Sequence, residues 1–269
     1  MVRRSENVQL TTYGLPLTAC FHMSGTRNIK LVIEYEGTRY CGWQVQPNVP
    51  TIQEGLECAV RQITGEAVRI FGAGRTDAGV HASGQVANFH TSCRMPAGRM
   101  RHALNAVLPD DIVVLDVSEV PESFHARYSA KSKRYRYSIL NRQAPSALHR
   151  YFTLHLAQPL DIAAMREAAG HLIGTWDFSS FGCNAGREDD PVRTVLDIAA
   201  DRQGDYLTIE IEAVSFLYKM VRSIVGTLID VGKGKVEPSD VLRILRDRDR
   251  KRAGATAPAQ GLTLVHVNY

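Results

Sequence analysis

Residues 72–81, Gly72-Ala73-Gly74-Arg75-Thr76-Asp77-Ala78-Gly79-Val80-His81, form a glycine-rich stretch that decides between two classes of fold. Glycines at 72 and 74 also begin the fingerprint of dinucleotide-binding proteins, but that fingerprint must open a helix. Here the chain continues into residues 85–91, which are rich in strand-forming residues. The stretch is therefore predicted to be a loop between two strands, which excludes a dinucleotide-binding fold.

The elements around this loop are predicted to follow the order β-α-β-β-α-β. A helix is expected at 51–64, because Thr51 and Glu54 form a capping box and Gly65 can end the helix. A second helix is expected at 98–108, where Pro109 stops it. Strands are expected at 28–35, 67–72, 85–91 and 112–120.

The same order recurs in the second part of the chain. Strands are expected at 133–140, 194–201, 206–213 and 262–267, and helices at 161–173, from about Ser215 onward, and at 239–248. Two β-α-β-β-α-β units are two ferredoxin-like halves. The sequence thus predicts an α+β protein whose two sheets lie side by side, with helices on one face and a central cleft between the halves.

Composition restricts the class of protein further. The 269 residues are 44% hydrophobic and 22% charged, with a mean hydropathy of −0.17, which excludes a disordered, collagen-like or disulfide-framework protein. No apolar run approaches the ~18 residues of a membrane span. Five widely spaced cysteines without a CxxC pair indicate reduced thiols in a cytoplasmic protein and no metal site.

The predicted elements divide the chain into three parts. Residues 1–27 are expected to be a disordered N-terminal extension rather than an export signal, because polar residues interrupt the only candidate apolar region. Residues 28–130 are predicted to form an N-terminal α/β half that carries the loop with Asp77. Residues 131–269 are predicted to form a C-terminal α/β half.

Asp77 is the first candidate for chemistry. It lies in a tight loop between small residues that allow a bulky ligand to approach the backbone, and Arg75 lies beside it. These features suit a carboxylate nucleophile or base with a neighbouring cation. The alternative is an ordinary exposed aspartate in a turn.

Basic and aromatic residues are concentrated between 124 and 137. Residues 127–136 contain five cations and no acid, although the whole chain has a net charge of only +4. Phosphate contacts and base stacking require cations beside aromatic rings. In a strand, Arg134 and Arg136 would share one face and Tyr135 and Tyr137 the other. The alternative is a solvated edge strand whose tyrosines are core. The five cations are Arg127, Lys131, Lys133, Arg134 and Arg136.

The third candidate stretch is a helix with a buried apolar stripe that begins with Leu217. Arg222 lies on the flank of this stripe, in an early turn. A cation so close to the core needs an anion, and a loop carboxylate from the other half is the candidate partner. The alternative is an arginine whose charged end extends to water.

Five motifs together resemble the tRNA pseudouridine synthase A family, from about Asn28 to Tyr269. They are YEGTRYCGWQ at 35–44, GRTDAGVHA at 74–82, FHARYSA at 124–130, KRYRY at 133–137 and FLYKMVR at 216–222. The chain departs from the family pattern at Lys219, where histidine is common, and residues 1–27 have no counterpart.

The resemblance implies roles for individual residues. Asp77 matches the catalytic aspartate, Tyr135 the tyrosine that stacks on the target uracil, and Arg222 the arginine that pairs with the aspartate. Leu217 matches the apolar residue near the base, while Arg75 and the basic stretch would contact RNA.

The resemblance also implies the pseudouridine synthase fold and a cytoplasmic homodimer without metal or cofactor. Such an enzyme isomerises uridine to pseudouridine at positions 38, 39 and 40 of the tRNA anticodon stem-loop.

Two other functions fit parts of the sequence. A non-catalytic RNA-binding protein of two RRM-like folds has the same element order, but residues 85–90 do not match the RRM strand motif. A glycosidic-bond hydrolase would pair Asp77 with a second carboxylate, Asp189 or Asp190. A binding module has no need for Arg75 and Asp77 opposite Arg222, and the second carboxylate of a hydrolase would lie in a polar, glycine-containing segment, 184–190, that is expected to be a mobile loop.

Overall fold

The computed structural model describes residues 25–183 and 190–269. Most of the predicted extension, residues 1–24, lies outside this range. The first strand, β1 (Arg27–Tyr35), begins one residue before the predicted boundary, and Arg27 pairs with Thr91.

The N-terminal half has the predicted element order. Its strands are arranged β4-β1-β3, and β2 pairs with the other edge of β3, which is the strand order of a ferredoxin-like fold. The elements are β1, α1 (Ile52–Thr64), β2 (Phe71–Gly72), β3 (His81–Thr91), α2 (Ala97–Val107) and β4 (Ile112–Val120).

The C-terminal half repeats this arrangement with the strand order β10-β5-β9-β8. Its main elements are β5 (Ser132–Asn141), α3 (Ile162–Gly170), β8 (Val192–Gln203), β9 (Tyr206–Ala213), α4 (Met220–Gly232) and β10 (Leu262–Asn268). Two strands, β6 (Leu154–Leu156) and β7 (Gly174–Asp177), and one α-helix, α5 (Asp240–Asp247), lie outside this repeat, and α5 matches the helix predicted at 239–248. In the described ranges, no helix combines the length and hydropathy that a membrane crossing requires.

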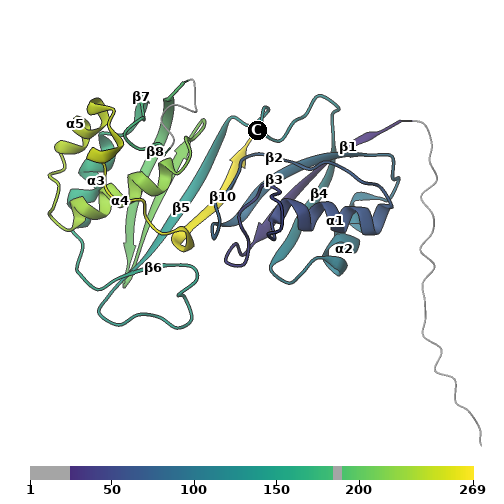
Figure 1. Cartoon of the computed structure of the whole chain (residues 1–269), viewed down its shortest axis with the longest axis horizontal. Coiled ribbons are helices and arrows are strands. Elements are labelled where there is room, and N and C mark those ends of the chain that lie inside the picture. The colour runs from purple at the N-terminus through teal and green to yellow at the C-terminus, as the bar shows by residue number, and fades with distance from the viewer. Residues whose placement is uncertain (1–24, 184–189) are drawn as a thin grey trace, which may run out of the picture.

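One strand joins the two halves into a single sheet. β10 pairs in parallel with β3 through Thr263 and Leu264, and it pairs in antiparallel orientation with β5 along its other edge. Figure 1 shows β10 between the two halves, with α1 and α2 at one end of the molecule and α3, α4 and α5 at the other. The predicted sheets are therefore side by side as one continuous sheet.

Helix α1 shows how local sequence sets element ends. The Thr51 side chain accepts a hydrogen bond from the Glu54 backbone N–H, and Gly65 ends the helix in the left-handed region with φ 77°. Both features were predicted from the capping box and the glycine.

Three predicted boundaries are wrong. The long helix α4 begins at Met220 rather than near Ser215, because Lys219 has φ 61° and this left-handed residue interrupts a helix. Only Phe71 and Gly72 of the predicted strand 67–72 pair with β3. β3 itself begins at His81, four residues before the predicted start.

Alternation along the strands separates a buried face from an exposed one. Tyr135, Tyr137 and Ile139 of β5 are buried, as are Ile209 and Ile211 of β9. These residues face the helices and form the core of the C-terminal half. The residues between them point to the opposite face of the sheet.

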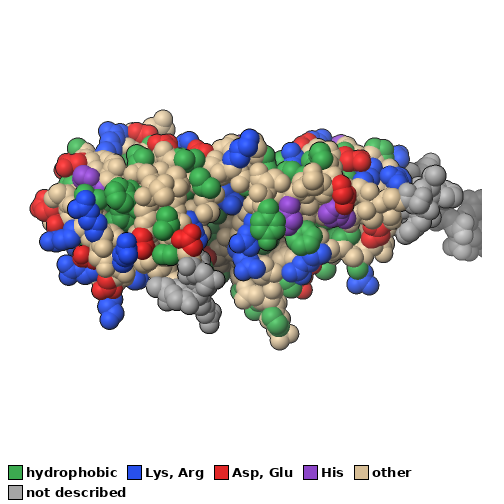
Figure 2. Space-filling model, turned by 90° about the horizontal axis from the view of Figure 1, so that it is seen from above, with side chains coloured by type: hydrophobic (Ala, Val, Ile, Leu, Met, Phe, Trp, Pro, Cys, Tyr) green, Lys and Arg blue, Asp and Glu red, His purple; other side chains and the backbone are tan. Residues whose placement is uncertain are grey.

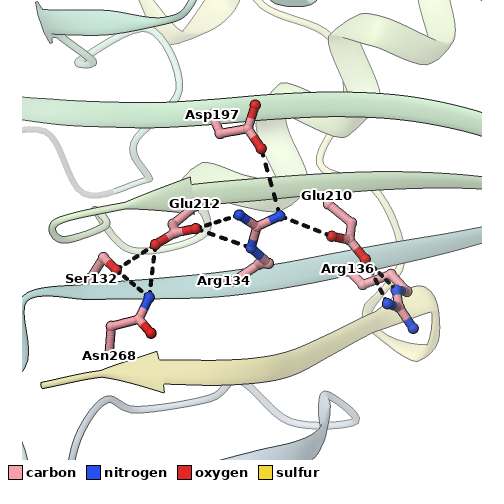
Figure 3. A network of polar contacts seen from close by, with 7 residues as sticks. All are labelled: Ser132, Arg134, Arg136, Asp197, Glu210, Glu212 and Asn268. Atoms are coloured by element: carbon pink, nitrogen blue, oxygen red, sulfur yellow. Dashed lines mark hydrogen bonds and ion pairs between the residues drawn. The ribbon is translucent and has the colours of Figure 1, made fainter.

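That opposite face carries the cluster of charges drawn in Figure 3. Arg134 lies across from Glu212 in the register of β5 and β9, and its guanidinium contacts Glu212, Glu210 and Asp197. Arg136 pairs with Glu210. The hydrogen bond from Ser132, followed by the one from Arg134, holds the pKa of Glu212 below its usual value.

Arg134→Met should lower stability at neutral pH and have little effect in acid. Because the folded-state pKa of Glu212 is lowered, its contribution exists above the ordinary value of 4.5 and disappears as pH falls through the folded pKa. We expect a loss of about 1–2 kcal/mol at pH 7, a few degrees in Tm. Thermal melts at pH 7 and pH 3 measure this.

The matched control is Arg136→Met, because Arg136 is more exposed than Arg134 and contacts one carboxylate rather than three. It should have a smaller effect at both pH values. A gap between wild type and Arg134→Met that widens in acid would contradict the assigned role of the cluster.

Candidate active site

The backbone of the Asp77 loop, residues 73–80, is fixed by the N-terminal half. The Thr76 carbonyl accepts a hydrogen bond from the Trp43 N–H at 3.0 Å, and the Thr76 hydroxyl is 2.8 Å from that of Tyr35. The Val80 N–H closes a turn onto the Asp77 carbonyl at 3.2 Å. These bonds hold Asp77 at the end of a rigid loop, with 20% of its side chain exposed.

A glycine permits this close packing. Gly42 has φ 92°, and a Cβ at this position would lie 2.5 Å from the Thr76 carbonyl oxygen. Any other residue would be strained here and would push Thr76, and with it Asp77, away from residue 42.

Arg222 approaches the loop from the C-terminal half. It lies in the first turn of α4, and its Nη1 donates to Asp77 Oδ2 at 2.8 Å. Its Nε donates to the Ala257 carbonyl at 2.7 Å, while the Ala257 N–H donates to the Arg222 carbonyl at 3.0 Å. Only 14% of the Arg222 side chain is exposed. The predicted pairing of Arg222 with the loop carboxylate is present, and it joins the two halves.

The segment that carries Ala257 lies directly on α4. A Cβ at Gly226 would lie 1.7 Å from the Ala255 carbonyl oxygen, so only glycine lets this backbone approach the helix. Gly254 donates to the hydroxyl of Thr227 at 2.9 Å. The position of Arg222 therefore depends on a close contact one turn further along the same helix.

Tyr135 reaches the same region from β5. It is 8% exposed, and its ring meets that of Phe216 edge to face at a centroid distance of 5.1 Å. Burial, followed by the proximity of Tyr35 and Asp77, raises the pKa of Tyr135. Among the described residues, its hydroxyl forms no hydrogen bond.

Tyr137, two residues further along β5, lies in the core of the C-terminal half. It is fully buried, and its hydroxyl donates to the Pro258 carbonyl at 2.8 Å. Both tyrosines lie in the core, as the alternative predicted, but the Tyr135 hydroxyl lies near Gly74 of the Asp77 loop and bonds to none of the described residues.

Leu217 lies just before α4, next to Phe216. It is buried, and the Met220 N–H donates to its carbonyl at 3.1 Å. Its side chain packs on Gly182, where a Cβ would come within 2.9 Å of it. Phe216 and Leu217 therefore form an apolar wall, of which only Leu217 was predicted; its neighbour in the same motif, Phe216, is the residue that touches Tyr135.

The predicted RNA-binding cations separate into two groups. The first group consists of Arg75, Arg127, Lys131 and Lys133. Lys133 lies against Gly74, and burial, assisted by the charge of Arg127, lowers its pKa. Arg75, Arg127 and Lys131 are exposed, and no carboxylate of the described residues pairs with them.

Arg134 and Arg136 form the second group. They lie on the opposite face of β5 from Tyr135, where carboxylates neutralise them (Figure 3). The geometry therefore gives no support to RNA contacts from Arg134 and Arg136.

A cavity lies outside this site. It has a volume of about 440 Å³, is lined by His81, Phe152 and several acids, including Glu36 and Asp111, and does not include Asp77. Its acidic lining does not suit a polyanion. No group of three or more His, Cys, Asp or Glu side chains in residues 25–183 and 190–269 is arranged to hold a metal ion.

Comparison with known proteins assigns the chain to a family. The family model described as tRNA pseudouridine synthase matches residues 31–129 and 168–269. The chain belongs to the tRNA pseudouridine synthase family. It is similar to proteins named tRNA pseudouridine synthase A from Thermoanaerobacter sp. (strain X514) and from Acetivibrio thermocellus, each 51% identical over 90% of this chain and 100% of the relative.

Solved structures show a weaker likeness. The archaeal box H/ACA sRNP Nop10-Cbf5 complex matches with a TM-score of 0.33 and 11% identity, over 86% of this chain and 58% of that chain. This chain thus spans a little over half of the matched one, and the family assignment rests on the sequence relatives.

Family membership decides between the predicted functions. As a tRNA pseudouridine synthase, the protein is an isomerase that acts on tRNA uridine. It is therefore neither a binding module of RRM-like folds nor a hydrolase. Of the two carboxylates considered for a hydrolase, Asp189 lies outside the described residues. Asp190 accepts from the Val192 N–H at 2.8 Å, a local contact at the start of β8.

Gly226→Ala should impair the synthase by displacing Arg222. The added methyl group must move the Ala255 carbonyl, which shifts the segment that holds Arg222 against Asp77. We expect a destabilisation of about 1–3 kcal/mol, as for overpacking, and at least a tenfold loss of kcat. Thermal melts and single-turnover rates measure both.

Gly170→Ala is the control, because a Cβ at this helical position meets nothing within 4 Å. It should keep wild-type activity and a Tm equal to or above that of wild type. Wild-type activity in Gly226→Ala would show that the contact with residue 255 does not position Arg222.

Proposed function

We propose that this synthase converts uridines at positions 38, 39 and 40 of the tRNA anticodon stem-loop to pseudouridine, with Asp77 as the carboxylate that acts at the ribose. The ion pair between Asp77 and Arg222 carries the proposal. The pair holds the Asp77 carboxylate between the two halves, and the Tyr135 hydroxyl, which bonds to none of the described residues, lies near Gly74 of the same loop.

The bond changes of the reaction show which groups the site must supply. The bond between N1 of uracil and C1′ of ribose breaks, the base rotates, and a bond forms between C5 and C1′. C5 loses a proton and N1 regains one, so no oxidant, hydrolysis or group donor is needed. An anionic group must stabilise or attack the ribose, and Asp77, which accepts the hydrogen bond from Arg222, is the candidate carboxylate.

The detached base must remain in the site during its rotation. Tyr135 can stack on uracil without fixing one orientation, and the wall of Phe216 and Leu217 excludes water from the same space. A uridine within a stem-loop is stacked on its neighbours, so it must be flipped out to reach Asp77.

The RNA backbone is proposed to follow the cations on the Asp77 side of the sheet. Arg75 extends from the loop itself, and Lys133 lies against Gly74. Arg127 and Lys131 continue this surface away from the loop. Arg134 and Arg136 are not included, because carboxylates on β9 already neutralise them.

The family resemblance supports two further proposals, a cytoplasmic location and a homodimer. tRNA is abundant in the cytoplasm, where reduced thiols such as those of Cys41 and Cys58 persist. Sedimentation analysis tests the oligomeric state, and a monomer at micromolar concentration would contradict the dimer.

Asp77→Asn should abolish pseudouridine formation and preserve tRNA binding. The amide keeps the size of the carboxylate but removes the negative charge that the reaction and Arg222 require. Carbodiimide labelling of pseudouridine in unmodified tRNA measures turnover, and a filter-binding assay measures affinity. We expect a loss of activity of at least 10³-fold with affinity within about tenfold of wild type.

Asp110→Asn is the control, because Asp110 is an exposed aspartate of the same half. It should behave as wild type in both assays. Substantial turnover by Asp77→Asn would refute the proposed role of Asp77, and release of free uracil by the wild type would indicate hydrolysis.

Tyr135→Phe and Tyr135→Leu should separate stacking from proton transfer. If the ring alone matters, the Phe variant retains most activity and the Leu variant loses about 1–3 kcal/mol of stacking. If the hydroxyl also moves the C5 proton, the Phe variant is slow and shows a larger isotope effect with 5-deuterated uridine. Single-turnover rates distinguish these outcomes.

Tyr137→Phe provides the comparison, because it removes a hydroxyl that bonds to the Pro258 carbonyl. It should lower Tm with little change in the rate per folded molecule. A stably folded and fully active Tyr135→Leu enzyme would exclude both roles of Tyr135.

A further inference from the structure

A group of aromatic side chains lies on the surface outside the Asp77 site. The ring of His125 is 5.2 Å from that of Phe71 and 4.4 Å from that of Tyr128, between centroids, with the planes tilted. Tyr128 is 78% exposed and Phe71 is also exposed. We call Phe71, His125 and Tyr128 the aromatic platform.

The turn that carries this platform is held rigidly. The Ala126 N–H donates to the buried Asn88 side chain at 2.8 Å, and the Tyr269 hydroxyl donates to the Ala126 carbonyl at 2.7 Å. The Ser129 N–H donates to the His125 carbonyl at 2.9 Å. Residues of the same motif thus alternate between anchoring the turn and presenting aromatic rings to solvent.

Rigid exposure of a large aromatic ring indicates a ligand. A tyrosine ring that already rests against His125 on a fixed turn loses little conformational freedom when it binds. Among residues 25–183 and 190–269, its contacts are the platform and Arg127, whose guanidinium lies 5.8 Å from its ring centroid. Such a ring is therefore available for stacking against a planar group.

The platform is adjacent to the proposed RNA path. Phe71 opens β2, which leads directly into the Asp77 loop. Arg127 is close enough to Lys133 for its charge to lower the pKa of Lys133, and Lys133 lies against Gly74 of that loop. Figure 2 shows a face on which Lys and Arg side chains flank hydrophobic and His side chains, on the half that carries α1 and α2.

We propose that the aromatic platform is a second base-binding site, on which Tyr128 stacks an unpaired nucleobase of the RNA substrate while the target uridine occupies the Asp77 site. This inference rests on the proposed function. Cations beside an exposed ring match a nucleotide, whose base is planar and whose phosphate is anionic. The platform holds the RNA in place and takes no part in the reaction itself.

Tyr128→Ala in the Asp77→Asn background, which binds RNA without converting it, tests the platform. An anticodon stem-loop RNA should bind about 5- to 100-fold more weakly, the loss expected for one stacked base. Tyr128→Phe should restore affinity, because it keeps the ring. The dependence on salt should keep its slope in Tyr128→Ala and fall by about 0.7–0.9 in Arg127→Ala.

Stem-loops with 2-aminopurine at each unpaired position in turn identify the stacked base. One position should be quenched on binding and regain fluorescence with Tyr128→Ala. Tyr151→Ala is the matched control, since Tyr151 is an exposed tyrosine with its own arginine, Arg150, 4.2 Å from the ring centroid. It should change neither affinity nor fluorescence.

Two results would contradict a base-binding role of the platform: an affinity of Tyr128→Ala equal to that of the Asp77→Asn parent, or an equal loss of affinity in Tyr128→Phe and Tyr128→Ala. Failure of the proposed function is a separate result, because it appears as absence of pseudouridine in the stem-loop treated with the wild-type enzyme. Melting curves of the variants should match their parent, since Tyr128 is outside the core.

Discussion

The ion pair of Asp77 and Arg222 is the constraint on which the rest of the site depends, because it joins residues 145 positions apart. A partly buried pair is stable only when both members are held in place. Thr76 and its partners fix the aspartate, and the contacts of Ala257 fix the arginine. The distance between Asp77 and Arg222 in turn depends on β10, which pairs with a strand of each half. The site is therefore a property of the whole sheet rather than of either half.

Strand β5 shows how one element serves two purposes. Its buried odd-numbered residues include Tyr137 and Tyr135, whose hydroxyl lies near Gly74 of the Asp77 loop, while its even-numbered residues hold a charge cluster on the far face. A local excess of positive charge in sequence is thus not by itself an RNA-binding surface. Carboxylates from a neighbouring strand can neutralise it, and only the cations that remain unpaired can bind phosphate.

Much of this arrangement could be predicted from local sequence. The capping of α1, the repeated element order and the need of Arg222 for an anion follow from short-range patterns. The start of α4 could not, since the left-handed conformation of Lys219 is set by its surroundings. The neutralisation of Arg134 also could not, because its partner Glu210 lies 76 residues away. The meeting of Phe71 with His125 likewise exists only in the folded chain.

The central position of β10 has a consequence for the timing of synthesis. Residues 262–268 leave the ribosome after the other strands of the described sheet, yet they fill its middle. Their parallel pairing with β3 joins residues roughly 180 positions apart, a slow and entropically unfavourable closure. Until that strand inserts, β5 presents an open edge that can pair with other chains. We expect a nascent chain on the ribosome to be inactive toward tRNA and to need protection from aggregation until residues 262–268 have emerged.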